Sequence, residues 1–172
     1  MNHGYVQVYT GNGKGKTTAA IGLAVRAAGA GMKVYFCQFL KGQNSSELNS
    51  LQQLKDHIEI RHFGNESFVT GIPSESDLNV AMDGFEEGVN AVMSGAYDLV
   101  VLDEINYAIY LNLIKLQSVV QLIRNKPDKV EIVLTGRNAA KEIIECADLV
   151  SEIKEIKHYF NKGVVARIGI ES

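Results

Sequence analysis

The sequence lacks the features that mark several common classes of protein. Its 172 residues carry 17 lysines and arginines against 20 aspartates and glutamates, which gives a formal net charge of −3. Without an excess of positive charge, a dedicated nucleic-acid-binding protein is disfavoured. No apolar run approaches the ~20 residues that span a membrane, because Arg26 interrupts the most apolar helical segment. We therefore expect no nucleic-acid partner and no membrane partner.

Cysteine is also scarce. The two cysteines, Cys37 and Cys146, lie near no histidine or second cysteine at the spacing of metal ligands. We expect both to be buried thiols. No secretory leader is recognisable at the N-terminus. These absences favour a reducing, cytoplasmic location.

Strand-like and helix-like segments alternate along the chain, and no repeat, low-complexity stretch or linker divides it. Strands are predicted at residues 5–9, 33–39, 58–63, 98–102, 130–134 and 149–156. Helices are predicted at residues 18–30, 47–55, 75–93, 116–126 and 139–146. Several strands are apolar and β-branched enough to be buried on both faces. This order predicts an α/β fold, a mostly parallel sheet with helices on both faces.

The clearest helix is the one predicted at residues 75–93. Apolar residues recur along it at intervals of three and four: Leu78, Met82, Phe85, Val89 and Val92. Ser74 and Asp77 form a capping pattern at its start. Gly84 and Gly88 weaken the helix locally, which close packing against a neighbour would explain.

A glycine-rich segment lies between the first predicted strand and the first predicted helix. Glycines allow backbone N–H groups to turn toward an anion, while Lys16 and the N-terminus of the helix add positive charge. This is the setting of a phosphate-binding loop, and the polyphosphate of ATP is the expected ligand. The residues expected to bind it are Gly11, Asn12, Gly13, Lys14, Gly15, Lys16, Thr17 and Thr18.

Thr10 departs from the usual loop pattern G-x-x-x-x-G-K-[ST], in which the first position is glycine. An unusual loop shape is one consequence. The alternative interpretation is a glycine-rich turn whose Lys14 and Lys16 are merely solvated. The strand before the segment and the helix after it favour the phosphate loop. Residues 1–172 are thus predicted to be a single P-loop nucleotide-binding domain of the P-loop NTPase (RecA-like) architecture.

Two adjacent carboxylates, Asp103 and Glu104, follow the apolar strand predicted at residues 98–102. Parallel strands bring their C-terminal ends to one crevice, so these carboxylates should lie near the phosphate loop. Mg²⁺ prefers hard oxygen ligands. We expect Thr17 and one carboxylate, Glu104 or Asp103, to bind it. The alternative is an acidic strand end exposed to water.

Several blocks of the sequence together resemble one specific family. They are GNGKGKTT at 11–18, VLDEINY at 101–107, LTGR at 134–137, ADLVSE at 147–152, IKH at 156–158, KG at 162–163 and ARIGIE at 166–171. In this order, and across nearly the whole chain, they resemble the ATP:corrinoid adenosyltransferases that carry a phosphate loop. The loop alone is shared by many NTPases, whereas the combination is specific.

The resemblance implies transfer of the 5′-deoxyadenosyl group of ATP to the Co(I) centre of a corrinoid, with release of triphosphate. The metal is the nucleophile, so the site needs no base; it must hold C5′ over the cobalt and stabilise the departing triphosphate. Lys16 and Glu104 are then the expected catalytic residues, Glu104 as a metal ligand rather than a general base. The family also implies a reduced flavin or flavoprotein as electron donor, and a homodimer.

Two further cations follow predicted strands and should project into the same crevice. Lys41 and Arg137 are expected to contact the phosphates or ribose of ATP, with solvated loop cations as the alternative for each. His158 matches the family's ending. For this residue a packing or hydrogen-bonding role is favoured over a ligand to cobalt.

The corrinoid side of the site departs from the better-known family pattern, in which a closely spaced Phe and Trp press on the corrin face. This chain has no tryptophan. In the corresponding stretch Phe68 is the expected corrinoid contact and Phe63 a weaker candidate, and for both a core position is the alternative. The sequence leaves open whether the corrinoid is a complete cobalamin or a precursor.

Two other functions are compatible with the loop and the carboxylates. One is a P-loop ATPase or small-molecule kinase, although no arginine-rich lid is evident. The other is a nucleotide-dependent switch without catalysis.

Overall fold

A single parallel sheet organises the chain. The computed structural model describes residues 2–41, 46–65 and 71–171. The six strands are β1 (Val6–Thr10), β2 (Val34–Phe39), β3 (Ile58–Phe63), β4 (Leu99–Asp103), β5 (Glu131–Thr135) and β6 (Leu149–Glu152). They pair in parallel in the order β3-β2-β4-β5-β1-β6. The predicted α/β class and parallel sheet are confirmed.

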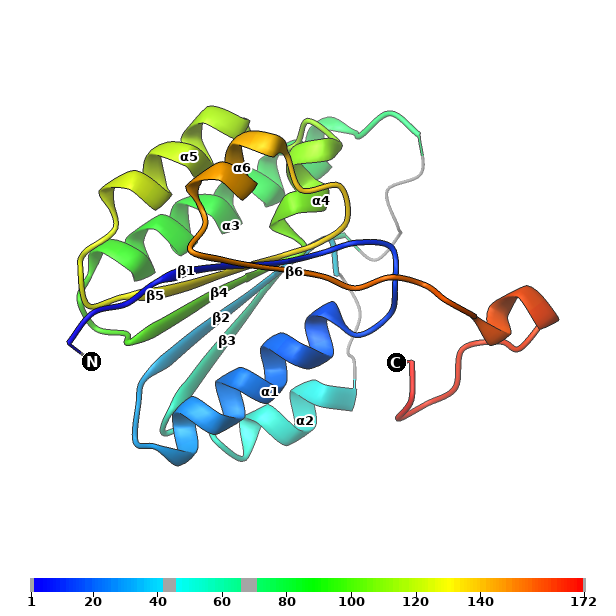
Figure 1. Ribbon diagram of the computed structural model, residues 1–172, viewed down its shortest axis with the longest axis horizontal. Coiled ribbons are helices and arrows are strands. Elements are labelled where there is room, and N and C mark those ends of the chain that lie inside the picture. The colour runs from blue at the N-terminus through cyan, green and yellow to red at the C-terminus, as the bar shows by residue number, and fades with distance from the viewer. Residues whose placement is uncertain (1, 42–45, 66–70, 172) are drawn as a thin grey trace.

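Helices cover both faces of this sheet, as Figure 1 shows. They are α1 (Lys16–Gly29), α2 (Ser46–Gln52), α3 (Glu75–Met93), α4 (Ile105–Tyr110), α5 (Leu116–Asn125) and α6 (Lys141–Cys146). One apolar core lies between the sheet and α1 and α2, and it includes Phe36 and Val101. A larger core lies between the opposite face and α3 to α6, and includes Leu102 and Leu134. The two-faced burial agrees with the apolar strands of the sequence.

The central strands of the sheet are more buried than the edge strand β6, as the strand order leads one to expect. Every residue of β2 and β4 is buried, because these central strands have neighbours on both sides and helices on both faces. The edge strand β6 is exposed throughout and ends at Glu152, so the prediction of a strand to residue 156 was too long. The short helix α4 and the 3-10 turn Tyr159–Lys162 were not predicted.

The helix α3 has the predicted bounds. Ser74 accepts a hydrogen bond from the Asp77 N–H, and the Asp77 side chain accepts from the Ser74 N–H, which completes the predicted capping box. A Cβ at Gly84 would lie 2.4 Å from Cγ of Phe63, so the glycine lets α3 approach the sheet. Small residues such as Ala81, Gly84 and Gly88 therefore form the buried face of α3. Met82, which the predicted apolar stripe included, is 59% exposed, so the prediction was wrong for this residue.

The two cysteines are free thiols with different surroundings. Cys37 in β2 is fully buried, and burial raises the pKa of its thiol. Cys146 ends α6 and is only partly buried, so the prediction that both thiols are buried was wrong for it. Among the described residues, none of the helices combines the length and apolar character needed to cross a membrane.

Candidate active site

The glycine-rich loop connects β1 to α1 and packs against the chain beyond β6. Gly15, at φ 120°, immediately precedes the first residue of α1, Lys16. The Gly13 N–H donates to the Ile153 carbonyl at 2.8 Å. A Cβ at Gly11 would lie 2.4 Å from the Ile153 carbonyl oxygen. This close approach is a second reason for glycine here, beside the turning of N–H groups toward an anion.

Thr10, the unusual first position of the loop, is the last residue of β1. Its side chain accepts a hydrogen bond from the Ala139 N–H at 3.3 Å, which links the end of β1 to the segment after β5. A glycine could not make this contact.

Lys16 points into the loop. Its Nζ donates to the carbonyls of Gly11 and Gly13, both at 2.8 Å, and only 6% of the residue is exposed. Burial lowers the pKa of Lys16, and the nearby Glu104 carboxylate opposes this shift. The loop thus holds a positive charge at its centre.

The two adjacent carboxylates are placed differently. Asp103 is fully buried at the end of β4. It accepts hydrogen bonds from Oγ1 of Thr17 at 3.2 Å, Nε2 of Gln38 at 3.1 Å and Oγ1 of Thr135 at 2.6 Å. Burial raises the pKa of Asp103 despite these donors. Gln38 and Thr135 were not predicted. For Gln38 the sequence did hold a signal, a glutamine inside the apolar strand Val34–Phe39, and the structure shows this glutamine to be fully buried.

Glu104 lies beyond the strand end, at φ 64°, and begins the turn into α4. This left-handed conformation is rare for a residue other than glycine and is typical of strained functional positions. It turns the Glu104 side chain toward the loop, while Asp103 stays beneath. Burial raises the pKa of Glu104, and the neighbouring Asp103 carboxylate adds to the shift.

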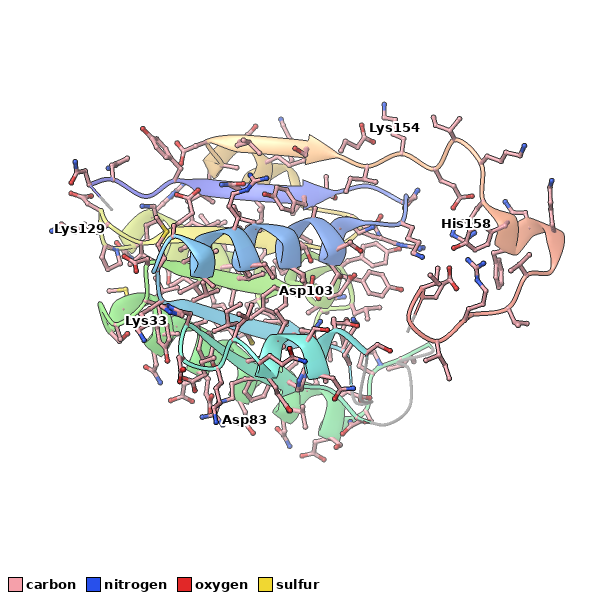
Figure 2. The ribbon with its side chains drawn as sticks, turned by 90° about the horizontal axis from the view of Figure 1, so that it is seen from below. Lys33, Asp83, Asp103, Lys129, Lys154 and His158 are labelled. Atoms are coloured by element: carbon pink, nitrogen blue, oxygen red, sulfur yellow. The ribbon has the colours of Figure 1, made fainter. Side chains whose placement is uncertain are left out.

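A cavity of about 750 Å³ opens between these elements. The loop residues Asn12 to Thr18, which include Lys14 and Lys16, line it together with Lys41, Glu104 and Arg137, so five of the predicted charged residues meet there. Lys41 forms an ion pair with Glu47 at 2.9 Å. Asp103 is fully buried and is not among the residues that line the cavity; Figure 2 shows it near the middle of the molecule.

Residues near the C-terminus form the outer wall of this cavity. They are Glu155, His158, Gly169, Ile170 and Glu171. The Nδ1 atom of His158 accepts from the Phe160 N–H at 3.0 Å; Figure 2 shows this histidine at the far side of the gap from the sheet. None of these wall residues was predicted as a site residue, and for His158 a packing or hydrogen-bonding role was favoured, although the match of the ending to the family was a signal for them.

The aromatic candidates for the corrinoid have different outcomes. Phe68 lies outside the described residues, so its role stays a prediction. Phe63 packs against Gly84 of α3 and against Phe39, with its ring centroid 6.5 Å from that of Phe39. Phe63 is partly buried and packs against the larger apolar core, in agreement with the alternative interpretation.

A glycine-rich loop between the first strand and helix, with a buried lysine at its centre and carboxylates from a nearby strand end, defines a phosphate-loop nucleotide-binding protein. The family described as ATP:corrinoid adenosyltransferase BtuR/CobO/CobP matches residues 2–172. The chain belongs to this family. It is a transferase that moves an adenosyl group from ATP to a corrinoid.

Individual relatives agree with this assignment. The corrinoid adenosyltransferase of Escherichia coli strain K12 is 37% identical over 170 residues, which cover 98% of this chain and 85% of the relative. The corrinoid adenosyltransferase CobA of Salmonella typhimurium is 35% identical over 170 residues, with the same coverage. The corrinoid adenosyltransferase of Pseudomonas aeruginosa is 33% identical over 169 residues, covering 98% of this chain and 83% of the relative.

Proposed function

We propose that ATP binds in the cavity between the phosphate loop and the C-terminal wall, and that its 5′-deoxyadenosyl group passes to a Co(I) corrinoid alongside. The observation that carries this proposal is the convergence of Lys16, Lys41 and Arg137 with Glu104 on one cavity. Three cations suit a triphosphate, whose charge grows as it leaves. Of the loop residues 11–18, residues 14–18 line the cavity and would supply backbone N–H donors, whereas the Gly13 N–H is already bound to the Ile153 carbonyl.

The proposed reaction needs positioning more than proton transfer. A cobalt electron pair forms the Co–C5′ bond while the C5′–O bond breaks, and the electron pair of that bond leaves with triphosphate. Lys16 stabilises the departing charge from the centre of the loop. Glu104 contributes as an oxygen ligand for a cation, because no hydroxyl or water has to be activated.

Mg²⁺ fits the oxygen atoms at the base of the cavity. Oγ1 of Thr17 lies 3.2 Å from Oδ2 of Asp103, and Glu104 lines the cavity itself. Within the described ranges, no group of three or more histidine, cysteine or acidic side chains could hold a metal. A cation here would therefore depend on one hydroxyl, one carboxylate, phosphate oxygens and water, the mixed set that Mg²⁺ favours. Bound there, it would screen the negative charge of the triphosphate.

Several partners complete the proposal. Reduction of the cobalt requires an electron donor, for which a reduced flavin or flavoprotein is proposed, and the protein is proposed to act as a homodimer. The two free cysteines are compatible with the proposed reducing, cytoplasmic location. The corrinoid is cobalamin or a biosynthetic precursor.

Product analysis tests this function. The protein is incubated anaerobically with ATP, Mg²⁺ and chemically reduced corrinoid and followed optically. We expect a light-sensitive adenosylcorrinoid and stoichiometric triphosphate. Accumulation of ADP would instead indicate an ATPase or kinase, and nucleotide binding without any product would indicate a switch. Omission of Mg²⁺, with EDTA present, should slow product formation.

A further inference from the structure

Lys14 is the second lysine of the phosphate loop, and it points away from the loop. We call residues 153–171 the C-terminal segment; it leaves β6 and extends beyond the sheet in Figure 1. The Nζ of Lys14 donates to Oη of Tyr159 at 3.3 Å, to the Ile170 carbonyl at 2.8 Å and to Oε1 of Glu171 at 3.0 Å. We call these four residues the clasp.

The clasp uses the full donor capacity of Lys14. An ammonium group has three N–H donors, and each has a partner in the C-terminal segment. While the clasp is closed, Lys14 has no donor left for a phosphate oxygen. Lys16 differs, because it lies among the carbonyls of the loop itself.

The acceptor side of the clasp is held in place by Arg167. Its Nη2 and Nε donate to the two carboxylate oxygens of Glu171 at 3.1 and 3.2 Å. The Arg167 guanidinium also lies 5.0 Å from the ring centroid of Tyr159. Only 15% of the Glu171 side chain is exposed. The hydrogen bonds from Arg167, with those from Tyr159 and Lys14, hold the pKa of Glu171 well below its usual range, so the carboxylate stays charged.

The C-terminal segment has little else to hold it against the loop. Its apolar side chains face solvent: Ile156, Phe160, Val165 and Ile168 are 91%, 70%, 75% and 90% exposed. Within the described part of the chain, every side-chain hydrogen bond that joins this segment to the loop involves Lys14. Among the described residues, the backbone hydrogen bonds between this segment and the end of β1 or the loop all involve Ile153.

We propose that Lys14 is a positioning residue for the nucleotide rather than a phosphate ligand. It anchors the C-terminal segment as the outer wall of the ATP cavity, where His158, Gly169 and Ile170 face the loop. Glu171 is its essential partner in this role. The inference rests on the proposed function, in that ATP is taken to occupy this cavity.

The test uses the full chain and ATP binding without corrinoid, so that no transfer takes place. Dissociation constants are measured by calorimetry for wild type, Glu171→Gln, Lys14→Met and the double variant. Each single variant should weaken ATP binding at least about fivefold, because a charge-assisted contact is lost. The double variant should bind ATP no more weakly than the single variant with the lower affinity, because both substitutions remove the same contact.

Hydrogen exchange adds a readout that involves no nucleotide. Residues 155–171 should exchange faster in both single variants, while the strands of the sheet keep wild-type exchange and so report correct folding. Glu145→Gln is the matched control: it removes the carboxylate of another lysine pair, Lys141–Glu145 at 3.4 Å, outside the cavity. It should leave both measurements unchanged.

Three results would overturn the inference. Tighter ATP binding by Glu171→Gln would mean that Glu171 competes with phosphate for Lys14, and additive losses in the double variant would mean that the two residues act separately. Wild-type affinity in both single variants would also overturn it. If wild type itself binds no ATP, the proposed function fails instead.

Discussion

Thr135 and Asp103 join the ends of two neighbouring strands at the base of the candidate active site. Oγ1 of Thr135 donates to Oδ1 of Asp103 at 2.6 Å and accepts from the Glu104 N–H at 2.9 Å. One hydroxyl of β5 therefore fixes the carboxylate of Asp103 and the backbone of Glu104. The hydrogen bond to the Glu104 N–H lies at the left-handed turn that places Glu104 on the cavity.

Replacing Thr135 by valine should test the bridge, because valine keeps the shape and removes the hydroxyl. Leaving a buried acceptor and N–H unpaired should cost ~1–3 kcal/mol in the free energy of unfolding, and adenosyl transfer should fall. Urea unfolding and initial rates measure the two effects. Thr135→Ser keeps the hydroxyl and should retain most activity. Unchanged stability and rate in Thr135→Val would show that the bridge is dispensable.

Removing the lysine at the centre of the loop should impair the use of ATP. Lys16→Ala should lose ~1.5–3 kcal/mol of interaction with phosphate, and more where that contact strengthens in the transition state. Steady-state kinetics with varied ATP measure this loss. Lys129→Ala, a lysine drawn far from the loop in Figure 2, is the control. Turnover by Lys16→Ala within about twofold of wild type would remove Lys16 from the mechanism.

Alanine in place of a helical glycine should have opposite effects on the free energy of unfolding in α3 and in α1, which cover opposite faces of the sheet. Gly84→Ala should destabilise the protein by ~1–3 kcal/mol, because the new methyl group would overlap Phe63 near its backbone. Gly22→Ala in α1 meets no atom within 4 Å and should stabilise by ~0.5–1 kcal/mol. Chemical denaturation compares the two. Equal effects would contradict the close packing of α3.

Phe68 should matter most when the cobalt has to be reduced. If it shapes the lower face of the corrin, Phe68→Ala should impair adenosylation from Co(II) with a weak reductant, because excluding an axial ligand raises the metal's reduction potential. With corrinoid already reduced to Co(I), the variant should keep far more activity, and ATP binding should hardly change. Equal loss in both assays, with a lower melting temperature, would place Phe68 in the core.

The sequence predicted those features that depend on local patterns or on strand polarity. The bounds of α3 follow from its cap and apolar spacing, and the meeting of the loop with Glu104 follows from parallel strands. The helix α4 was missed because it has six residues and no side-chain cap. The turn at Glu104 that starts it is hydrogen-bonded to Thr135, a partner distant in sequence. The C-terminal wall was missed because its contacts with Lys14 join opposite ends of the chain.

The position of β1 has a consequence for biosynthesis. The strand that carries the phosphate loop pairs with β5 and β6, the last two strands along the chain. During synthesis the glycine-rich sequence leaves the ribosome before β5 and β6, so β1 cannot pair until both strands have been made. Such long-range pairing is slow to form. A nascent chain halted before Glu131 would contain the complete loop sequence but no place in a sheet for it. We therefore expect ATP to stabilise only chains long enough to include β5 and β6.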